Sequence, residues 1–190
     1  SVPKPGEVTL AHRGVLFLDE FPEFDRKVID TLRQPLEDRV VSVSRAKGTA
    51  HFPAQFILIA AMNPCPCGNF GTKEKECVCN SFNLLKYQRK ISGPIIERID
   101  LWIEVGRINH SKLTEKSRLG EETVTIKQRV FKAREIQIER FKKLNLPIKI
   151  NSEMSGKDLL MHLPLSSDVL TILNTSAEKL DLSPRVYHRI

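Results

Sequence analysis

The strongest constraint in this sequence is a short apolar run that leads directly into two carboxylates. Residues 15–18 read Val-Leu-Phe-Leu, and Asp19 and Glu20 follow before Phe21 and Pro22 end the run. Such runs are typical of strands buried on both faces of a parallel sheet, whose ligands bind at the carboxyl ends of the strands. Paired carboxylates there suit phosphoryl transfer, in which one holds Mg²⁺ and the other orients a water. A buried strand that ends in a solvated acidic turn is the alternative.

The composition is that of a folded intracellular chain. Hydrophobic residues make up 41% of the 190 residues and charged residues 28%, which allows a packed core. No apolar run approaches the length of a membrane span, and the first residues do not form a signal peptide, so we expect a cytoplasmic protein with no membrane partner. The net charge of +7 permits a polyanionic partner such as nucleic acid or ATP.

A second apolar run, over 55–61, predicts another fully buried strand. It ends at Asn63, which we expect at the same edge of the sheet as Asp19. The other elements predicted in the first half are a helix over 25–36 capped by Asp25, a β-hairpin over 39–53, a helix over 84–91, a helix that restarts at 92–94, and a third strand over 101–105.

The second half has helical periodicity throughout. Helices are predicted over 123–144, 155–163 and 166–180, and Ser183 and Pro184 predict the start of a fourth. We therefore expect the half of a catalytic core over 1–106, a polar linker over 107–122, and a helical domain over 123–190.

Four cysteines lie close together in the sequence, as Cys65, Cys67, Cys77 and Cys79. Four thiolates on two short loops match the ligand number of a structural zinc site, although the usual spacing is Cys-x-x-Cys. The glycines and the charged residues between the two pairs leave this loop few apolar side chains with which to fold unaided. Zinc, reduced free thiols and disulfides all remain open.

Arg45 and Lys47 lie near the tip of the predicted hairpin, with His51 close by. These side chains are candidate contacts to DNA phosphates. A solvated turn is the simpler interpretation, and we favour it for this chain in isolation.

Together these motifs resemble the AAA+ ATPases, and within them the magnesium-chelatase-like group of the ComM type. Four segments carry the resemblance, in the same order and spacing as in the family: 6–20 (GEVTLAHRGVLFLDE), 60–64 (AAMNP), 92–100 (SGPIIERID) and 182–185 (LSPR). The implied fold is α/β: a partial AAA+ (P-loop NTPase) core with a parallel sheet and a β-hairpin insert, followed by an all-α lid.

The resemblance also implies roles for five residues. Asp19 corresponds to the Walker B carboxylate that binds Mg²⁺, and Glu20 to the one that polarises the attacking water. Asn63 corresponds to sensor 1, which positions that water. Arg98 corresponds to the arginine finger, which points outward into the site of a neighbouring subunit. Arg185 corresponds to sensor 2, which contacts the nucleotide from the lid.

One departure from the family pattern is important. The phosphate-binding sequence Gly-x-x-x-x-Gly-Lys-Ser/Thr does not occur in these 190 residues, and without it little remains to cradle the β- and γ-phosphates. We therefore expect a fragment of a longer protein that does not hydrolyse ATP by itself.

For the intact protein the resemblance implies a ring, expected to be a homohexamer, that hydrolyses ATP with Mg²⁺. The implied work is DNA helicase or branch-migration activity in competence or recombination. Two alternatives stay open: a chelatase-type motor that drives metal insertion into a porphyrin, and a non-catalytic zinc-binding interaction module.

Overall fold

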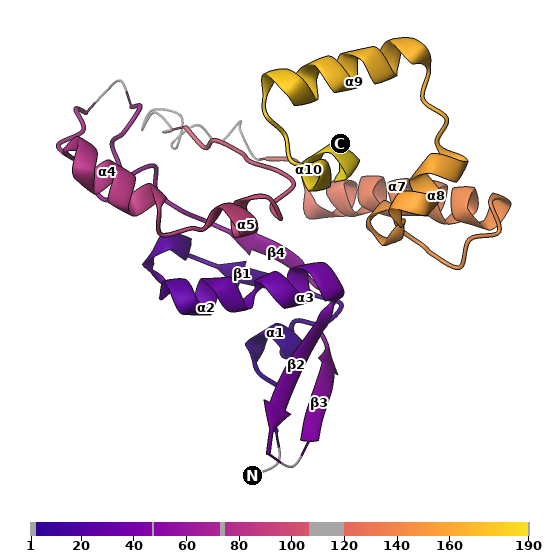
Figure 1. The fold of residues 1–190 in the computed structure, drawn as a ribbon, viewed down its shortest axis with the longest axis horizontal. Coiled ribbons are helices and arrows are strands. Elements are labelled where there is room, and N and C mark those ends of the chain that lie inside the picture. The colour runs from indigo at the N-terminus through magenta and orange to yellow at the C-terminus, as the bar shows by residue number, and fades with distance from the viewer. Residues whose placement is uncertain (1–2, 47, 73–74, 107–119, 190) are drawn as a thin grey trace. The chain divides into compact units, whose positions relative to one another are not determined.

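The computed structural model describes residues 3–46, 48–72, 75–106 and 120–189. The chain divides into two compact units, Ser1–Trp102 and Ile103–Ile190, which are drawn in Figure 1 and described separately below. The expected boundaries of core, linker and helical domain stay a prediction, since most of the linker expected over 107–122 lies outside the described residues.

Unit 1 mixes strands and short helices, which confirms the α/β fold class. Its elements in chain order are α1 (Glu7–Leu10), β1 (Val15–Leu18), a 3₁₀ turn (Phe21–Glu23), α2 (Arg26–Thr31), α3 (Arg33–Asp38), β2 (Val40–Arg45), β3 (Gly48–Pro53), β4 (Ile57–Ala60), α4 (Ser81–Gln88) and α5 (Gly93–Ile96).

The two apolar runs of the sequence, now β1 and β4, pair in parallel. Their register runs from Val15 opposite Ile57 to Leu18 opposite Ala60. Backbone hydrogen bonds continue past the strands, because Ala61 donates to the Leu18 carbonyl at 2.9 Å and Phe21 donates to the Ala61 carbonyl at 2.9 Å. The carboxyl ends of both strands therefore lie at one edge of the sheet, as the sequence predicted.

The helix predicted over 25–36 is two helices in the structure. Asp25 caps α2 as predicted, accepting a hydrogen bond from the Lys27 N–H at 2.7 Å. The chain breaks at Leu32 and restarts as α3, because Pro35 has no N–H to donate one turn back and its ring crowds the preceding turn.

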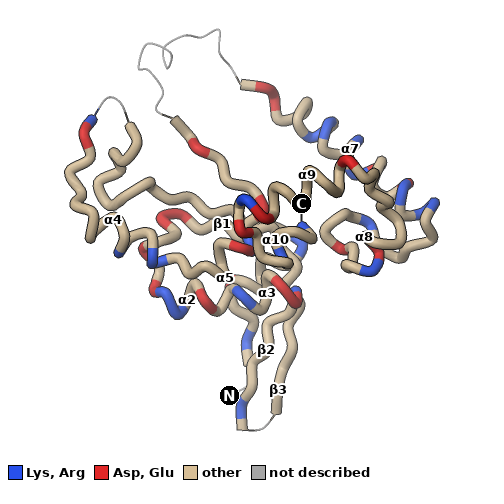
Figure 2. Tube along the Cα trace, turned by 45° about the horizontal axis from the view of Figure 1, so that its top comes forward, with Lys and Arg blue, Asp and Glu red and all other residues tan. Residues whose placement is uncertain are grey.

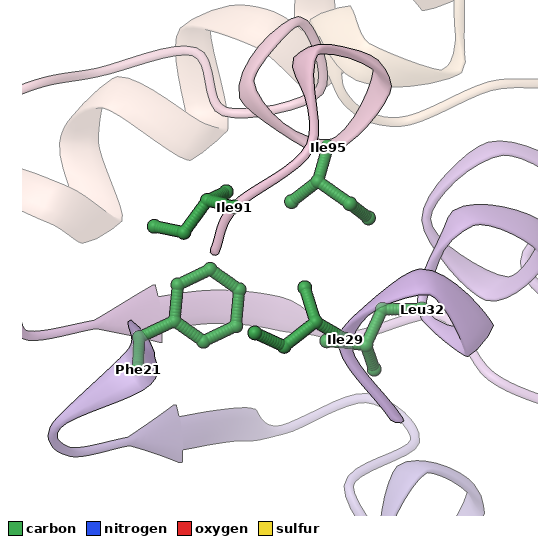
Figure 3. Close-up of a cluster of buried hydrophobic side chains, with 5 residues drawn as sticks. All are labelled: Phe21, Ile29, Leu32, Ile91 and Ile95. Carbon is green, nitrogen blue, oxygen red and sulfur yellow. The ribbon is translucent and has the colours of Figure 1, made fainter. Parts of the chain in front are cut away.

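The core of unit 1 joins one face of the sheet to three other segments. Its buried side chains are Phe21, Ile29, Leu32, Ile91 and Ile95, and Figure 3 shows them facing one another from the turn after β1, from α2 and from the chain around α5. Leu16 and Leu18 of β1 pack against this cluster. The first turn after β1 is therefore anchored in the core.

The other face of the β1–β4 sheet is open within the described residues, so the prediction that both strands are buried on both faces is wrong for this chain. Val15 and Phe17 are 52% and 59% exposed, and Ile57 and Ile59 are similarly exposed. The reason is that the described helices supply apolar partners to one face only.

The third strand predicted over 101–105 does not form. Among the described residues this segment has no ladder partner, and Leu101, Ile103 and Val105 are largely exposed. Alternating apolar residues fix a strand only where a neighbouring strand takes up the backbone hydrogen bonds, and the described sheet offers none here.

The predicted β-hairpin is confirmed. Strands β2 and β3 pair antiparallel, from Val40 opposite Pro53 to Arg45 opposite Gly48. The hairpin extends away from the β1–β4 sheet (Figure 1). Arg39 precedes it with a positive φ of 59°, which turns the chain out of α3.

Unit 2 is helical, as predicted. It contains α7 (Thr123–Lys143), a 3₁₀ turn (Asn151–Glu153), α8 (Gly156–His162), α9 (Ser167–Lys179) and α10 (Pro184–Arg189). Serine side chains cap three of the helices, including Ser183, which accepts from the Val186 N–H ahead of α10. None of the helices described here combines the length and the apolar character needed to cross a membrane.

The core makes a test of unit 1 straightforward. Replacing Ile29, which is 1% exposed, by alanine should lower the free energy of unfolding by about 2–5 kcal/mol, because it leaves a cavity between α2 and the sheet. Val28→Ala on the same helix, where the side chain is 54% exposed, should cost about 0.5 kcal/mol or less. Urea unfolding followed by circular dichroism measures both, and equal losses would contradict this core.

Candidate functional site

The parallel pairing of β1 and β4 brings three predicted site residues to one edge of the sheet. Asp19 and Glu20 follow β1 directly, and Asn63 lies three residues past the end of β4. All three side chains are exposed. The Asp19 carboxylate accepts the Glu20 N–H at 2.9 Å, and Glu20 adopts a left-handed φ of 48°, which turns the chain sharply back toward the core.

Tyr87 of α4 lies beside this edge, and no motif in the sequence pointed to it. The residue is 5% exposed, and its hydroxyl is hydrogen-bonded by the backbone of Asn63. Burial raises the pKa of Tyr87, and the nearby negative charges of Glu23 and Glu20 raise it further. The phenol therefore stays protonated. Its hydrogen bond joins α4 to the segment that carries Asn63, and Glu20 is near enough to affect the pKa of Tyr87.

A second polar cluster holds the entry to α5. The buried Ser92 hydroxyl donates to the Asp30 carboxylate at 2.7 Å, and Arg33 contacts both groups, at 2.9 Å to Asp30 and 3.1 Å to Ser92. The Ser92 hydrogen bond and the Arg33 charge hold the pKa of the Asp30 carboxyl below its usual value. This cluster fixes the chain between α4 and α5 against α2.

Within the single chain Arg98 lies against α3, and its expected role toward a neighbouring subunit stays a prediction. Its guanidinium forms an ion pair with Glu37 of α3 and donates to the Pro94 carbonyl, and its side chain is only 9% exposed. Glu37 lies 61 residues earlier in the chain, so no local pattern in the sequence predicts this pair.

Two other predicted contact residues, Arg185 and Arg45, belong to α10 and β2. Arg185 is an exposed residue near the start of α10 in unit 2, and Arg45 is the exposed last residue of β2. Lys47 lies outside the described residues. Figure 2 marks further Lys and Arg positions along α7, which no motif in the sequence singled out.

The four cysteines converge, although they come from two separate pairs. The Sγ atom of Cys65 lies 3.4 Å from that of Cys67 and 3.8 Å from that of Cys77, and the Cys67 and Cys77 sulfurs are 3.6 Å apart. The Cys79 sulfur lies within 4.8 Å of the other three. All four thiols are free, so the structure does not contain the disulfides that the sequence left open.

The backbone polarises these thiols unequally. The Asn69 N–H bonds the Cys67 sulfur and, with other donors, lowers the pKa of Cys67 to about 6. A backbone bond from Cys79 lowers the pKa of Cys77, but burial and the adjacent Cys67 and Cys65 sulfurs outweigh it and raise that pKa to about 12. The lower pKa makes Cys67 ionise more readily than Cys77.

Comparison with known proteins identifies the class of protein to which this chain belongs. A family model described as magnesium chelatase, subunit ChlI, matches residues 1–113. A second, described as magnesium chelatase, subunit ChlI C-terminal, matches residues 120–190. The class is AAA+ ATPase-like, with a partial AAA+ core and a helical C-terminal unit. The chain belongs to the magnesium chelatase ChlI family, as the resemblance of its motifs indicated.

Individual relatives agree with this assignment. The chain is 42% identical over 191 residues to the competence protein ComM of Haemophilus influenzae, covering 100% of this chain and 36% of that protein. It is 37% identical over 190 residues to the Escherichia coli protein YifB, again covering 100% of the chain and 36% of the relative. The chain therefore spans about a third of the length of these curated relatives.

A more distant match covers only part of the chain. The DNA replication licensing factor mcm-6 of Caenorhabditis briggsae is 30% identical over 101 residues, which are 53% of this chain and 11% of that protein. This likeness relates the chain to a second group of AAA+ proteins.

The Ser92–Asp30 contact predicts a specific pH dependence. Because the pKa of Asp30 is lower in the folded chain than its ordinary value of 3.8, its charge stabilises the fold above that value, and this contribution is lost as the pH falls through the lowered pKa. The Ser92→Ala variant should therefore lose less stability on acidification from pH ~5 to pH ~2 than the parent chain.

The matched control is Ser44→Ala, which removes an exposed hairpin hydroxyl that is hydrogen-bonded to Thr49 at 3.1 Å. Urea unfolding at a series of pH values measures all three proteins. Parallel stability curves for the parent chain and Ser92→Ala would contradict the assigned role of Asp30.

Proposed function

We propose that the whole protein containing this chain is a Mg²⁺-dependent ATPase that works as a ring of identical subunits and remodels DNA. The single observation that carries the proposal is the parallel register of β1 and β4, because it brings Asp19, Glu20 and Asn63 to the edge where ligands of α/β sheets bind.

The residue types at this edge suit ATP hydrolysis. A carboxylate is a preferred Mg²⁺ ligand, and Asp19, fixed by its bond to the Glu20 N–H, takes that role in the proposal. Glu20 orients and polarises the attacking water, and the Asn63 amide positions the same water beside the γ-phosphate. The Tyr87 hydroxyl holds the Asn63 backbone, so the amide is presented from a fixed main chain.

Two arginines complete the proposed machinery. Arg98 acts in the site of the neighbouring subunit, where a cation neutralises the charge that develops on the transferred phosphoryl group. To do so it leaves Glu37, with which it is paired in the single chain. Arg185 at the start of α10 contacts the nucleotide as sensor 2.

The phosphate cradle must come from outside this chain, since no Gly-x-x-x-x-Gly-Lys-Ser/Thr sequence occurs in it. In the proposal the 190 residues bind ATP weakly or not at all by themselves, and the ATPase site forms only in the whole protein.

DNA as the substrate is supported by the relatives and by charge. One relative is named for competence and another for DNA replication licensing, and the chain has a net charge of +7. Arg45 and Lys47 near the hairpin tip are the proposed phosphate contacts. A chelatase-type motor is the second candidate, favoured by the family description. The two candidates differ in what stimulates hydrolysis, which is DNA for the first and a porphyrin-binding partner protein for the second.

The Glu20→Gln substitution in the whole protein tests the assignment of the water-activating residue. Hydrolysis should fall by about 10²–10⁴-fold, because the amide cannot accept a proton, while ATP binding is retained. Glu23→Gln is the matched control, since Glu23 is three residues further along the same turn and forms only a partly exposed pair with Lys90. Steady-state turnover and nucleotide binding by calorimetry separate the effects; a Glu20→Gln protein with parental turnover would rule out this role.

Subunit mixing tests the role of Arg98. Alone, Arg98→Ala and Glu20→Gln proteins should each be inactive, the former by about 10³–10⁵-fold. In a mixed ring, an Arg98→Ala subunit keeps its own Glu20 and receives Arg98 from a Glu20→Gln neighbour, so activity should return on mixing. Turnover measured across mixing ratios decides the point: if every mixture stays inactive, Arg98 does not act across the subunit boundary.

A further inference from the structure

The cysteine cluster lies outside the machinery proposed for ATP hydrolysis, and its geometry points to a separate site. We propose that Cys65, Cys67, Cys77 and Cys79 bind one Zn²⁺ ion as a tetrathiolate structural site that fixes the loop between β4 and α4. Metal binding at these residues does not depend on the proposed ATPase function.

The sulfur positions match the coordination sphere of a single zinc ion. Four sulfurs at a Zn–S distance of about 2.3 Å form a tetrahedron with edges of about 3.8 Å. The distances among the sulfurs of Cys65, Cys67 and Cys77 are 3.4, 3.6 and 3.8 Å, and the Cys79 sulfur lies within 4.8 Å of each. The single intervening residues within each cysteine pair therefore do not prevent convergence on one point.

The arrangement suits a shared ion better than disulfides. A disulfide brings two sulfurs to about 2.05 Å and leaves the other two sulfurs in a separate bond. Here the Cys67 sulfur is nearly equidistant from Cys65 on its own side and Cys77 on the other. Three mutually adjacent sulfurs need a common partner, and a tetrahedral set of four sulfurs is typical of zinc.

Hydrogen-bond donors around the sulfurs complete the site. The Phe70 N–H donates to the Cys65 sulfur at 3.3 Å, and the Asn69 side-chain amide donates to the Cys67 sulfur at 3.8 Å. Asn69 is 5% exposed, so a polar side chain is buried against the cluster and aimed at it. Such donors offset the negative charge of thiolate ligands and orient them around a metal.

The loop has few other sources of stability among its described residues. Apart from Cys65, its large apolar side chains are exposed, with Phe70 at 47% and Val78 at 83%. Gly68 and Gly71 adopt positive φ angles of 75° and 77°, so the loop folds tightly around the sulfurs without an apolar core. A bound metal supplies the free energy that apolar burial does not.

The four cysteines lie between the two segments that the Tyr87–Asn63 contact joins, namely the segment of Asn63 and helix α4. Cys65 comes two residues after Asn63, and Asn80, which follows Cys79 directly, caps α4 by accepting the Asn83 N–H at 2.8 Å. Because α4 carries Tyr87, the ion would hold the segment of Asn63 and the helix of Tyr87 in register. On binding, each thiol that becomes a ligand releases its proton to solvent, so affinity falls on acidification.

Metal analysis of the whole protein, purified without added metal or chelator, tests the site. We expect the Cys67→Ser and Cys79→Ser variants each to contain about one zinc equivalent less per chain than the parent. Two matched controls should keep the parental zinc content: Glu76→Gln, which replaces the carboxylate next to Cys77 by a neutral amide and leaves every thiol, and Glu20→Gln, which lacks ATP hydrolysis in the proposed mechanism. Cobalt(II) in place of zinc should give the intense visible bands of tetrahedral thiolate coordination in the parent and controls.

Several results would overturn the proposal. One is equal zinc content in the parent protein and the cysteine variants. Others are iron in place of zinc, or cysteines that resist alkylation because they are joined as disulfides. Circular dichroism shows whether a cysteine variant has unfolded, and in that case the zinc content and cobalt spectrum of the parent protein decide by themselves. If a cysteine variant loses zinc but keeps ATP hydrolysis, the metal site is supported and only its effect on Asn63 is ruled out.

Discussion

The parallel pairing of β1 with β4 is the constraint on which the rest of unit 1 depends. Ile57 lies 42 positions after its partner Val15, so closing this pair loops out the segment that contains α2, α3 and the hairpin. The same pairing decides that Asp19, Glu20 and Asn63 leave the sheet at one edge. A sheet slipped by one residue would turn Leu16 and Leu18 away from the core, so core packing and placement of the site are set by one register.

The core also controls the site at closer range. Phe21 follows Glu20 directly and is 1% exposed, so the left-handed turn at Glu20 is held by a side chain locked into the apolar cluster. Ile95, which is fully buried, does the same for α5, three residues before Arg98. Asp19 and Glu20 are therefore exposed groups attached to a buried neighbour, an arrangement that keeps their charged side chains in water while fixing their main chain.

Local patterns in the sequence were sufficient for most of the elements and for the caps at Asp25 and Ser183, because these caps bond residues only two or three positions away. Contacts between distant residues were not accessible in this way. The pairing of Arg98 with Glu37, and the hydrogen bond of Tyr87 to the Asn63 backbone, join segments whose proximity depends on the whole fold. The strand patterns led to two wrong predictions, at the outer face of the sheet and over 101–105. An apolar pattern indicates that a segment needs a packing partner, but it does not identify that partner.

The ion pair of Arg98 bears directly on how a ring of such subunits would work. A guanidinium with a side chain only 9% exposed needs an anionic partner, since an unpaired buried charge is costly. Glu37 provides that partner, and its own side chain is 43% exposed, so water can solvate the carboxylate once the arginine leaves. A phosphate carries more charge and accepts the same forked hydrogen bonds, whereas a neutral protein surface offers neither. In the proposed ring, Arg98 therefore exchanges Glu37 for a neighbouring site only when that site holds nucleotide, which couples the arginine to the ligand through electrostatics alone.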